Sequence, residues 1–79
     1  MPRYYLHLRD DLDVPDEDGV ELPDLATAHD HAVKQARFSL GQTALDEGKI
    51  NFSHRIDIED ERGTILDTVW FREVVRIEG

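Results

Sequence analysis

The chain has 79 residues, a formal net charge of −9 at pH 7 and no cysteine. A chain of this length buries only about 60% of its unfolded surface, so we expect a single domain over residues 1–79 whose thin core would gain from self-association. The lack of cysteine excludes disulfides and zinc–thiolate sites and fits a reducing compartment. The acidic balance disfavours nucleic acid as a partner. No apolar run reaches the roughly 18 residues of a membrane span, so no membrane association is expected.

The first strand is predicted at residues 3–9, where apolar and polar side chains alternate. Tyr4, Leu6 and Leu8 form the apolar face that we expect to point into the core. The opposite face carries aromatic and cationic residues, namely Arg3, Tyr5, His7 and Arg9. Because this strand follows the initiator Met directly, no secretory signal peptide is expected, and we predict a cytoplasmic protein.

An acidic segment follows, and residues 1–24 carry eight carboxylates against two arginines, which is −6 of the total charge. Residues 10–18 are rich in aspartate and predict a loop or a wide turn. A short strand is predicted at residues 19–22, and Pro23 ends it because proline cannot donate a hydrogen bond to a neighbouring strand. We expect this short strand to form a hairpin with residues 3–9.

A helix is predicted from the N-cap Asp24 to residues 46–48. A stripe of mostly small residues at helical spacing is expected to pack on the sheet, namely Leu25, Ala28, His29, Ala32, Ala36, Leu40 and Thr43. Phe38 lies nearly opposite this stripe. Gly41 costs about 1 kcal/mol of helix stability relative to alanine, which allows a kink or an early end near Leu40.

A second hairpin is predicted from residues 50–59, which alternate strictly, and residues 64–71, which are rich in β-branched and aromatic side chains. The turn between them ends at Gly63, where a positive φ is required. We expect Ile56 to lie at the centre of the core and its neighbour Asp57 to face solvent.

The inward face of the last strand has two alternatives. A four-residue loop would place inside the set Ile65, Val69 and Phe71. A three-residue loop with a bulge would place inside the set Leu66, Thr68 and Trp70. We favour the first, because it matches apolar with apolar residues and leaves only Asp67 awkward. Residues 72–79 are predicted either as a frayed strand or as a short helical turn.

The element order is therefore β-β-α-β-β. This order predicts an α+β fold, a single two-layer domain in which an antiparallel sheet carries one helix on one face.

Three stretches carry a family resemblance: residues 1–10 (MPRYYLHLRD), residues 18–24 (DGVELPD) before the alanine-rich helix, and residues 56–71 in the second hairpin. They resemble a family of small bacterial proteins that is defined only as a domain of unknown function, with an N-terminal Met-Pro-Arg-Tyr-Tyr/Phe-x-His signature. Asp11 and Trp70 depart from the family pattern, which has glycine and proline at these positions. The resemblance implies a family and a fold, but no activity, cofactor or catalytic residue.

The acidic loop is a candidate site for a hard divalent cation, which prefers oxygen ligands. Its carboxylates are Asp10, Asp11, Asp13, Asp16 and Asp18. Their spacing lacks the pattern of a calcium-binding helix–loop–helix motif, so we expect a solvated loop. His29 and His31 point about 200° apart on the helix and cannot share an ion. His7 and His54 fall on different strands, and no cofactor or metal is expected.

No catalytic motif is present, because the chain lacks a cysteine nucleophile, a Gly-x-Ser-x-Gly elbow and a glycine-rich phosphate loop. A domain of this size is also not expected to provide a pocket of about 300 Å³, the lower end of the range that encloses substrates. We therefore predict that the protein is not an enzyme.

The predicted interaction surface is the outer face of the sheet, whose aromatic and arginine side chains are typical of interfaces. The candidate residues are Arg3, Tyr5, His7, Arg9, Arg55 and Trp70, together with Phe38 on the helix. The leading hypothesis is a protein-interaction domain that forms a homodimer or other homo-oligomer. One alternative is a module that neutralises a small basic protein, because the acidic strand–loop–strand followed by residues 22–25 (LPDL) is similar in outline to HicB-type antitoxins. Another is a weak divalent-cation-binding module.

Overall fold

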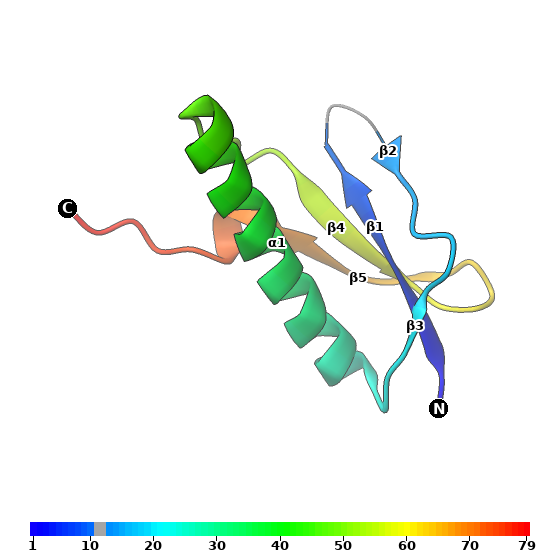
Figure 1. The fold of residues 1–79 in the computed structure, drawn as a ribbon. Coiled ribbons are helices and arrows are strands. Elements are labelled where there is room, and N and C mark those ends of the chain that lie inside the picture. The colour runs from blue at the N-terminus through cyan, green and yellow to red at the C-terminus, as the bar shows by residue number, and fades with distance from the viewer. Residues whose placement is uncertain (11–12) are drawn as a thin grey trace.

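The structure, a computed structural model, describes residues 1–10 and 13–79. Within these residues, five antiparallel strands and one α-helix form two layers (Figure 1). The elements are β1 (Arg3–Arg9), β2 (Asp13–Val14), β3 (Val20–Glu21), α1 (Leu25–Glu47), β4 (Arg55–Glu59), β5 (Ile65–Trp70) and the 3-10 helix η1 (Phe71–Glu73). The predicted α+β fold, with one helix across one face of an antiparallel sheet, is confirmed.

The sheet has the strand order β2-β1-β4-β5, and β3 pairs with the N-terminal part of β1. Tyr4 lies opposite Val20, which confirms the predicted first hairpin. At the other end of β1, the two residues of β2 pair with Leu8 and Arg9. This short strand lies inside the acidic segment, where a loop or wide turn was predicted.

The core lies between the sheet and α1. Ala28, Ala32 and Ala36 are fully buried at intervals of four residues, so one side of the helix is smooth and approaches the sheet closely. Ile56 and Ile58 of β4 are likewise fully buried beneath it. The central position of Ile56 is therefore confirmed, and so is most of the predicted stripe, whereas its member His29 is exposed.

Both ends of α1 are capped as predicted. The Asp24 carboxylate accepts hydrogen bonds from Thr27 Oγ1 (2.7 Å) and Thr27 N (2.8 Å). These bonds, the hydroxyl first, hold the pKa of Asp24 below its ordinary value of 3.8. Gly48 has a φ of 68°, and its N–H donates to Ala44 O at 3.0 Å.

The helix passes through Gly41 to Glu47, so the allowance for a kink or an early end near Leu40 was wrong. The cost of one exposed glycine is outweighed by the two caps and the burial of Leu40. No helix in the described part of the chain combines the length and the apolar composition that crossing a membrane requires.

The strand predicted from residue 50 begins only at Arg55, so that part of the prediction was wrong. The Asn51 side-chain oxygen accepts hydrogen bonds from Ser53 N (2.9 Å) and Ser53 Oγ (2.6 Å). Such a local bond offers the backbone an alternative to strand pairing, and it turns the chain at this point. Phe52 still packs against the core, but Ile50 is 55% exposed.

The favoured alignment of β5 is confirmed except at its first residue. Val69 pairs with Ile56 and is buried, as is Phe71. A bulge after Ile58 sets Ile65 opposite Glu59, where Ile65 is 45% exposed instead of buried.

Asp67, the one charged residue at an inward position of β5, contacts a histidine on the helix and a backbone N–H of its own strand. Asp67 Oδ2 lies 2.8 Å from His29 Nδ1 on α1, and Asp67 Oδ1 accepts from Thr68 N at 2.8 Å. The helix therefore provides a partner for a carboxylate that faces it.

The segment after β5 forms a helical turn, one of the two predicted alternatives. Phe71 opens η1 and is buried, and its N–H donates to His54 O at 3.0 Å. Arg37 Nε donates to Val74 O at 2.7 Å and ties this turn to α1. The last residues then run away from the body of the molecule beside the C-terminal half of the helix (Figure 1).

Candidate interaction surface

Alternate residues of β1, β4 and β5 build the face of the sheet that α1 leaves uncovered. The cross-strand pairs on this face are Tyr5 with Glu59, His7 with Asp57, Arg9 with Arg55, Asp57 with Thr68, and Arg55 with Trp70. Most of the predicted interface residues therefore share one surface.

Asp57 lies at the centre of this face and is only 8% exposed. Its carboxylate accepts hydrogen bonds from Arg9 Nε (3.2 Å) and Thr68 Oγ1 (3.0 Å), and it lies 3.4 Å from Arg55 Nε. The expectation that Asp57 faces solvent was wrong, because Arg9 from the neighbouring β1 and Arg55 from its own strand cover it. The burial of this carboxylate is compensated by two cations and a hydroxyl.

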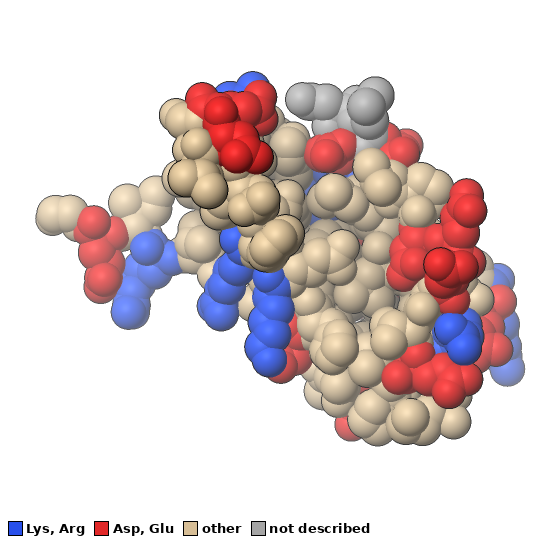
Figure 2. Space-filling model, viewed as in Figure 1, with Lys and Arg blue, Asp and Glu red and all other residues tan. Residues whose placement is uncertain are grey.

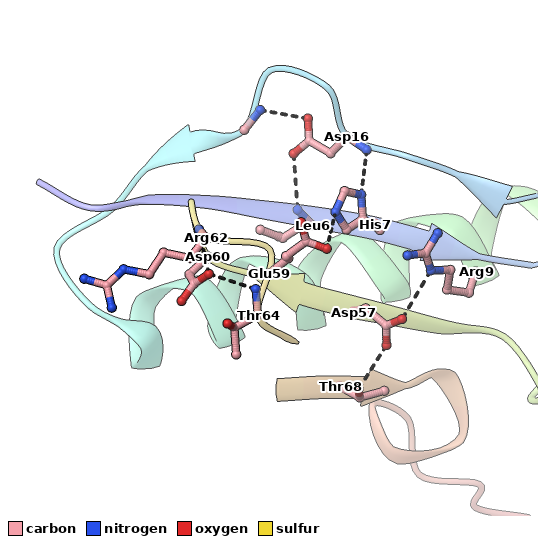
Figure 3. Close-up of polar contacts among 11 residues, drawn as sticks. Leu6, His7, Arg9, Asp16, Asp57, Glu59, Asp60, Arg62, Thr64 and Thr68 are labelled. Carbon is pink, nitrogen blue, oxygen red and sulfur yellow. Dashed lines mark hydrogen bonds and ion pairs between the residues drawn. The ribbon is translucent and has the colours of Figure 1, made fainter. Parts of the chain in front are cut away.

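His7 is also buried on this face, at 8% exposure. Asp16 N donates to its Nδ1 at 3.0 Å, and its Nε2 lies 3.3 Å from Glu59 Oε2 (Figure 3). Because Nδ1 accepts, the proton of the neutral ring sits on Nε2 and is directed at Glu59. The Tyr5 ring stacks beside the imidazole, at 6.4 Å between centroids.

The segment around Asp16 folds back over β1 and covers His7. The Asp16 carboxylate accepts from Leu6 N at 3.2 Å (Figure 3). It also accepts from Gly19 N at 3.0 Å. Gly19 has a φ of 71°, and a Cβ there would lie 2.9 Å from side-chain atoms of Arg3 and Tyr5. Only glycine fits both the backbone conformation and this close approach.

Trp70 lies at the other end of the face and contacts two arginines. The Arg55 guanidinium carbon is 5.5 Å from the centre of the indole, and that of Arg72 is 4.9 Å away. Both distances are within the range of cation–π attraction. Together with Arg9, these residues form what we call the arginine–tryptophan surface: Arg9, Arg55, Trp70 and Arg72.

Two other candidate interface residues, Arg3 and Phe38, lie away from the arginine–tryptophan surface. Arg3 is engaged at the β3 edge, where it donates to Asp18 O at 2.9 Å and pairs with Glu21 at 3.2 Å. Phe38 lies on α1, in the other layer, and is 70% exposed. The predicted set therefore divides into a sheet group and one helix residue.

Sequence reasoning missed Arg72 and the burial of Asp57. Arg72 falls just beyond the strand, where the sequence left the conformation open, and the turn η1 brings it back onto Trp70. A charged residue in an alternating strand signals solvent exposure unless the charges on neighbouring strands are known. Arg55 lies two residues before Asp57 on the same strand, whereas the approach of Arg9 depends on the pairing of β1 with β4, which no local pattern reveals.

The candidate metal ligands of the acidic loop are placed separately. Asp16 is committed to two backbone N–H groups, Asp13 and Asp18 are exposed, and Asp11 lies outside the described residues. Within residues 1–10 and 13–79, no three His, Cys, Asp or Glu side chains are arranged to hold a metal ion.

The remaining histidines that were weighed as ligands have separate partners. His29 pairs with Asp67, whereas the His54 ring packs edge-on against the buried Phe71 at 5.6 Å between centroids. His7 and His54 therefore belong to opposite faces of the sheet.

The described surface has two hollows of about 320 Å³ each, so the expectation that the domain offers no pocket of this volume was wrong. One lies beside the β4–β5 turn, next to Arg3 and Arg62. The other is apolar and lies along the C-terminal half of α1. Neither is lined by residues of the arginine–tryptophan surface.

Comparison with known proteins places the chain in a family. The family described as a domain of unknown function, DUF6894, matches residues 3–72, which include every strand and the whole of α1. No curated protein and no solved structure matches the chain. The resemblance to an uncharacterised domain family is thus confirmed, and the chain belongs to the DUF6894 family.

Proposed function

We propose that this chain is a protein-interaction domain without enzymatic activity, and that it binds through the arginine–tryptophan surface. The observation that carries the proposal is the contact of two guanidinium groups with one indole on a sheet face that the helix leaves open. Tryptophan, tyrosine and arginine are the residues most enriched among those that dominate binding energy at protein interfaces.

The partner that fits this surface is an acidic segment of another protein. Arg9 and Arg55 contact the Asp57 carboxylate and Arg72 contacts Trp70, so three arginines accompany one carboxylate and the surface is locally cationic in a chain whose net charge is −9. Contact with Trp70 restrains Arg55 and Arg72. Arg55 also lies against Asp57, so the guanidinium edge of Arg72 is the one that we expect to bind the partner. Such an edge can hold a carboxylate by two parallel hydrogen bonds.

The polar groups beside the surface support a binding role rather than catalysis. Both ring nitrogens of His7 have partners, and the Asp57 carboxylate is held by Arg9 and Thr68. A general base needs an acceptor atom within hydrogen-bond reach of a substrate proton. These groups are instead committed to bonds that hold the strands and the Asp16 segment together.

The proposal is tested with a hexaglutamate peptide and the fluorescence of Trp70, the single tryptophan of the chain. We expect a saturable change in emission that weakens as salt screens the charges. Arg72→Gln should weaken binding about tenfold, the effect of losing one charged hydrogen bond.

The matched control is Arg62→Gln, which removes the same charge from an exposed position in the β4–β5 turn and should leave binding unchanged. The proposal fails if the peptide leaves the Trp70 emission unaltered, or if the two variants weaken binding equally.

A second candidate function is capture of a small basic protein by the acidic side of the chain, as in the antitoxin-like hypothesis. Exposed carboxylates gather around β2 and β3, namely Asp13, Glu17, Asp18 and Glu21. Figure 2 shows acidic side chains clustered on the side of the molecule where β3 lies. This candidate requires a neighbouring reading frame whose product, a small basic protein, co-purifies with this chain. The absence of such a reading frame would exclude the antitoxin-like function.

We further propose that the protein works in the cytoplasm of a bacterium. The lack of cysteine supports this location. The resemblance of residues 1–7 to the signature of a family of small bacterial proteins supports the origin. Fractionation of the source cells should recover the chain with the cytosol, and recovery from an extracytoplasmic fraction would contradict it.

A further inference from the structure

The outer side of α1 carries a second apolar surface, in the layer opposite the arginine–tryptophan surface. Phe38 and Leu45 are 70% and 80% exposed and lie seven residues apart, on one side of the helix. An apolar groove of about 320 Å³ runs beside them, and we call it the helix groove. Its lining includes Leu40, Gly41, Ala44, Ile50, Phe52 and Ile77. Exposed apolar surfaces of this kind mark interaction sites.

We propose that this surface binds a second copy of the chain, with the two α1 helices packed antiparallel near Gly41 and Phe38 of each copy packed against Leu45 of the other. A two-fold dimer needs a surface that is complementary to itself. In an antiparallel pair centred on Gly41, Phe38 lies three residues before the centre and Leu45 four residues after it, on the same side of the helix. The Phe38 ring of one copy therefore faces the exposed Leu45 of the other.

Gly41 lies at the centre of this arrangement and carries no side chain. A Cβ built on Gly41 meets no atom within 4 Å, so no described part of the chain uses the space beside it. Glycine here costs helix stability but leaves the backbone open to a close approach by another helix.

The charges along α1 favour a second copy as the occupant. The last turn carries Asp46 and Glu47 and no basic residue, although the C-terminal end of a helix is already negative. Lys34 is 73% exposed and lies seven residues before Gly41, about 10 Å along the axis. The negative end of the helix lies at the same distance beyond Gly41.

Antiparallel packing therefore brings Lys34 of each copy to the acidic end of the other helix. Figure 2 shows acidic side chains with a cation beside them at the C-terminal end of α1, and further cations beside its middle. Lys49 lies 3.6 Å from Glu47, and Lys34 of the other copy would add a second cation that compensates the carboxylates and the helix dipole.

Sedimentation equilibrium of the full chain at micromolar concentration tests the proposal, in about 0.15 M salt so that the net charges are screened beyond about 8 Å. The wild type should sediment as a monomer–dimer equilibrium. Phe38→Ser removes the ring and should weaken dimerisation at least about tenfold, as truncation of a central interface residue does. Leu66→Ser, which makes the same kind of change at an exposed position on β5, should leave it unaltered.

Gly41→Leu provides a variant whose fold is not at risk, because the new side chain meets open space within the chain and leucine favours helix. It should weaken the dimer while the helical circular dichroism is kept. A wild type that remains monomeric overturns the proposal, as does a dimer that both Phe38→Ser and Gly41→Leu leave intact.

A charge reversal distinguishes a direct contact of Lys34 with the other copy from the general repulsion between two negatively charged chains. Lys34→Glu and Arg62→Glu change the net charge equally, but only Lys34 lies on the proposed interface. We expect Lys34→Glu to weaken the dimer several-fold more than Arg62→Glu, and equal effects would overturn the antiparallel arrangement. The hexaglutamate titration reports on the other layer, so dimerisation can fail while the proposed function holds.

Discussion

Ile56 and Asp57 are neighbours on β4 and both are buried, Ile56 beneath the helix and Asp57 beneath arginines on the opposite face. A two-layer domain of this kind usually has one solvated sheet face, on which polar side chains tolerate substitution. Here the open face buries two polar side chains, His7 and Asp57, beneath their neighbours. β4 is therefore sensitive to substitution on both faces.

Ile56→Ala should lower the free energy of unfolding by about 2–5 kcal/mol, because it leaves a cavity between α1 and the sheet. This is a large share of the stability of so small a domain. Urea denaturation followed by circular dichroism measures the loss. Ile77→Ala, at a position that is 76% exposed, should change stability by less than about 0.5 kcal/mol. Equal effects of the two substitutions would contradict the assigned core.

Asp57→Ala should lower the free energy of unfolding by about 1–3 kcal/mol, because it removes the acceptor shared by Arg9 and Thr68. Asp57→Asn keeps an acceptor oxygen for one of them and should cost less. Asp30→Ala removes an exposed carboxylate that pairs only within α1, and it serves as the control. The polar network would be refuted as a stabilising element if the melting temperatures of the Asp57→Ala and Asp30→Ala variants coincided.

Gly19→Ala should destabilise the fold more than Gly63→Ala does. Both glycines have a positive φ, of 71° and 84°, and alanine in this region costs about 1–2 kcal/mol at either position. A Cβ on Gly19 additionally meets Arg3 and Tyr5 atoms at 2.9 Å, whereas the nearest atom to one on Gly63 is 3.9 Å away. Thermal denaturation of the two variants measures the difference, and a reversed order would show that the acidic segment does not pack closely on β1.

The capping of α1 by Asp24 should depend on pH. Because its pKa is lowered in the folded state by Thr27, the stabilisation is present above the unfolded pKa and is lost as the pH falls through the lower, folded value. Asp24→Asn also caps a helix but does not titrate. The stability of the wild type relative to Asp24→Asn should therefore decline below about pH 4.

Denaturation of both proteins at pH values from about 6 to about 2 checks this expectation, and all other carboxylates cancel in the comparison. A difference that stays constant over this range would show that the Asp24 carboxylate is not a cap in solution.

The elements whose signals are local in the sequence were predicted well. The alternation of residues 3–9, the cap at Asp24 and the glycine at position 63 each specify a backbone conformation without distant partners. The element order then left few arrangements other than a helix on one face of an antiparallel sheet.

The predictions failed where the backbone conformation depends on a specific polar contact or on an irregularity in strand pairing. Asn51 turns the chain before β4 although the apolar alternation extends back to residue 50. The bulge after Ile58 moves the Ile65 side chain from the core face to the other face of the sheet, because one extra residue reverses the side-chain direction. The candidate surface was found in outline, but the return of Arg72 onto Trp70 depends on a turn that no periodic pattern marks.

The bond between Asp67 and Thr68 has a consequence for how the sheet ends. Since Phe71 N points towards His54 on the β4 side, alternation directs Thr68 N to the free edge of β5. A free edge is a template for strand addition and fibril growth, and a charged side chain at that edge is a natural protection against it. The Asp67 carboxylate already occupies the Thr68 N–H, so the carbonyl of an incoming strand has to displace it. A residue at an unexpected position in an apolar strand thereby removes one of the backbone groups with which a foreign strand would pair at this edge.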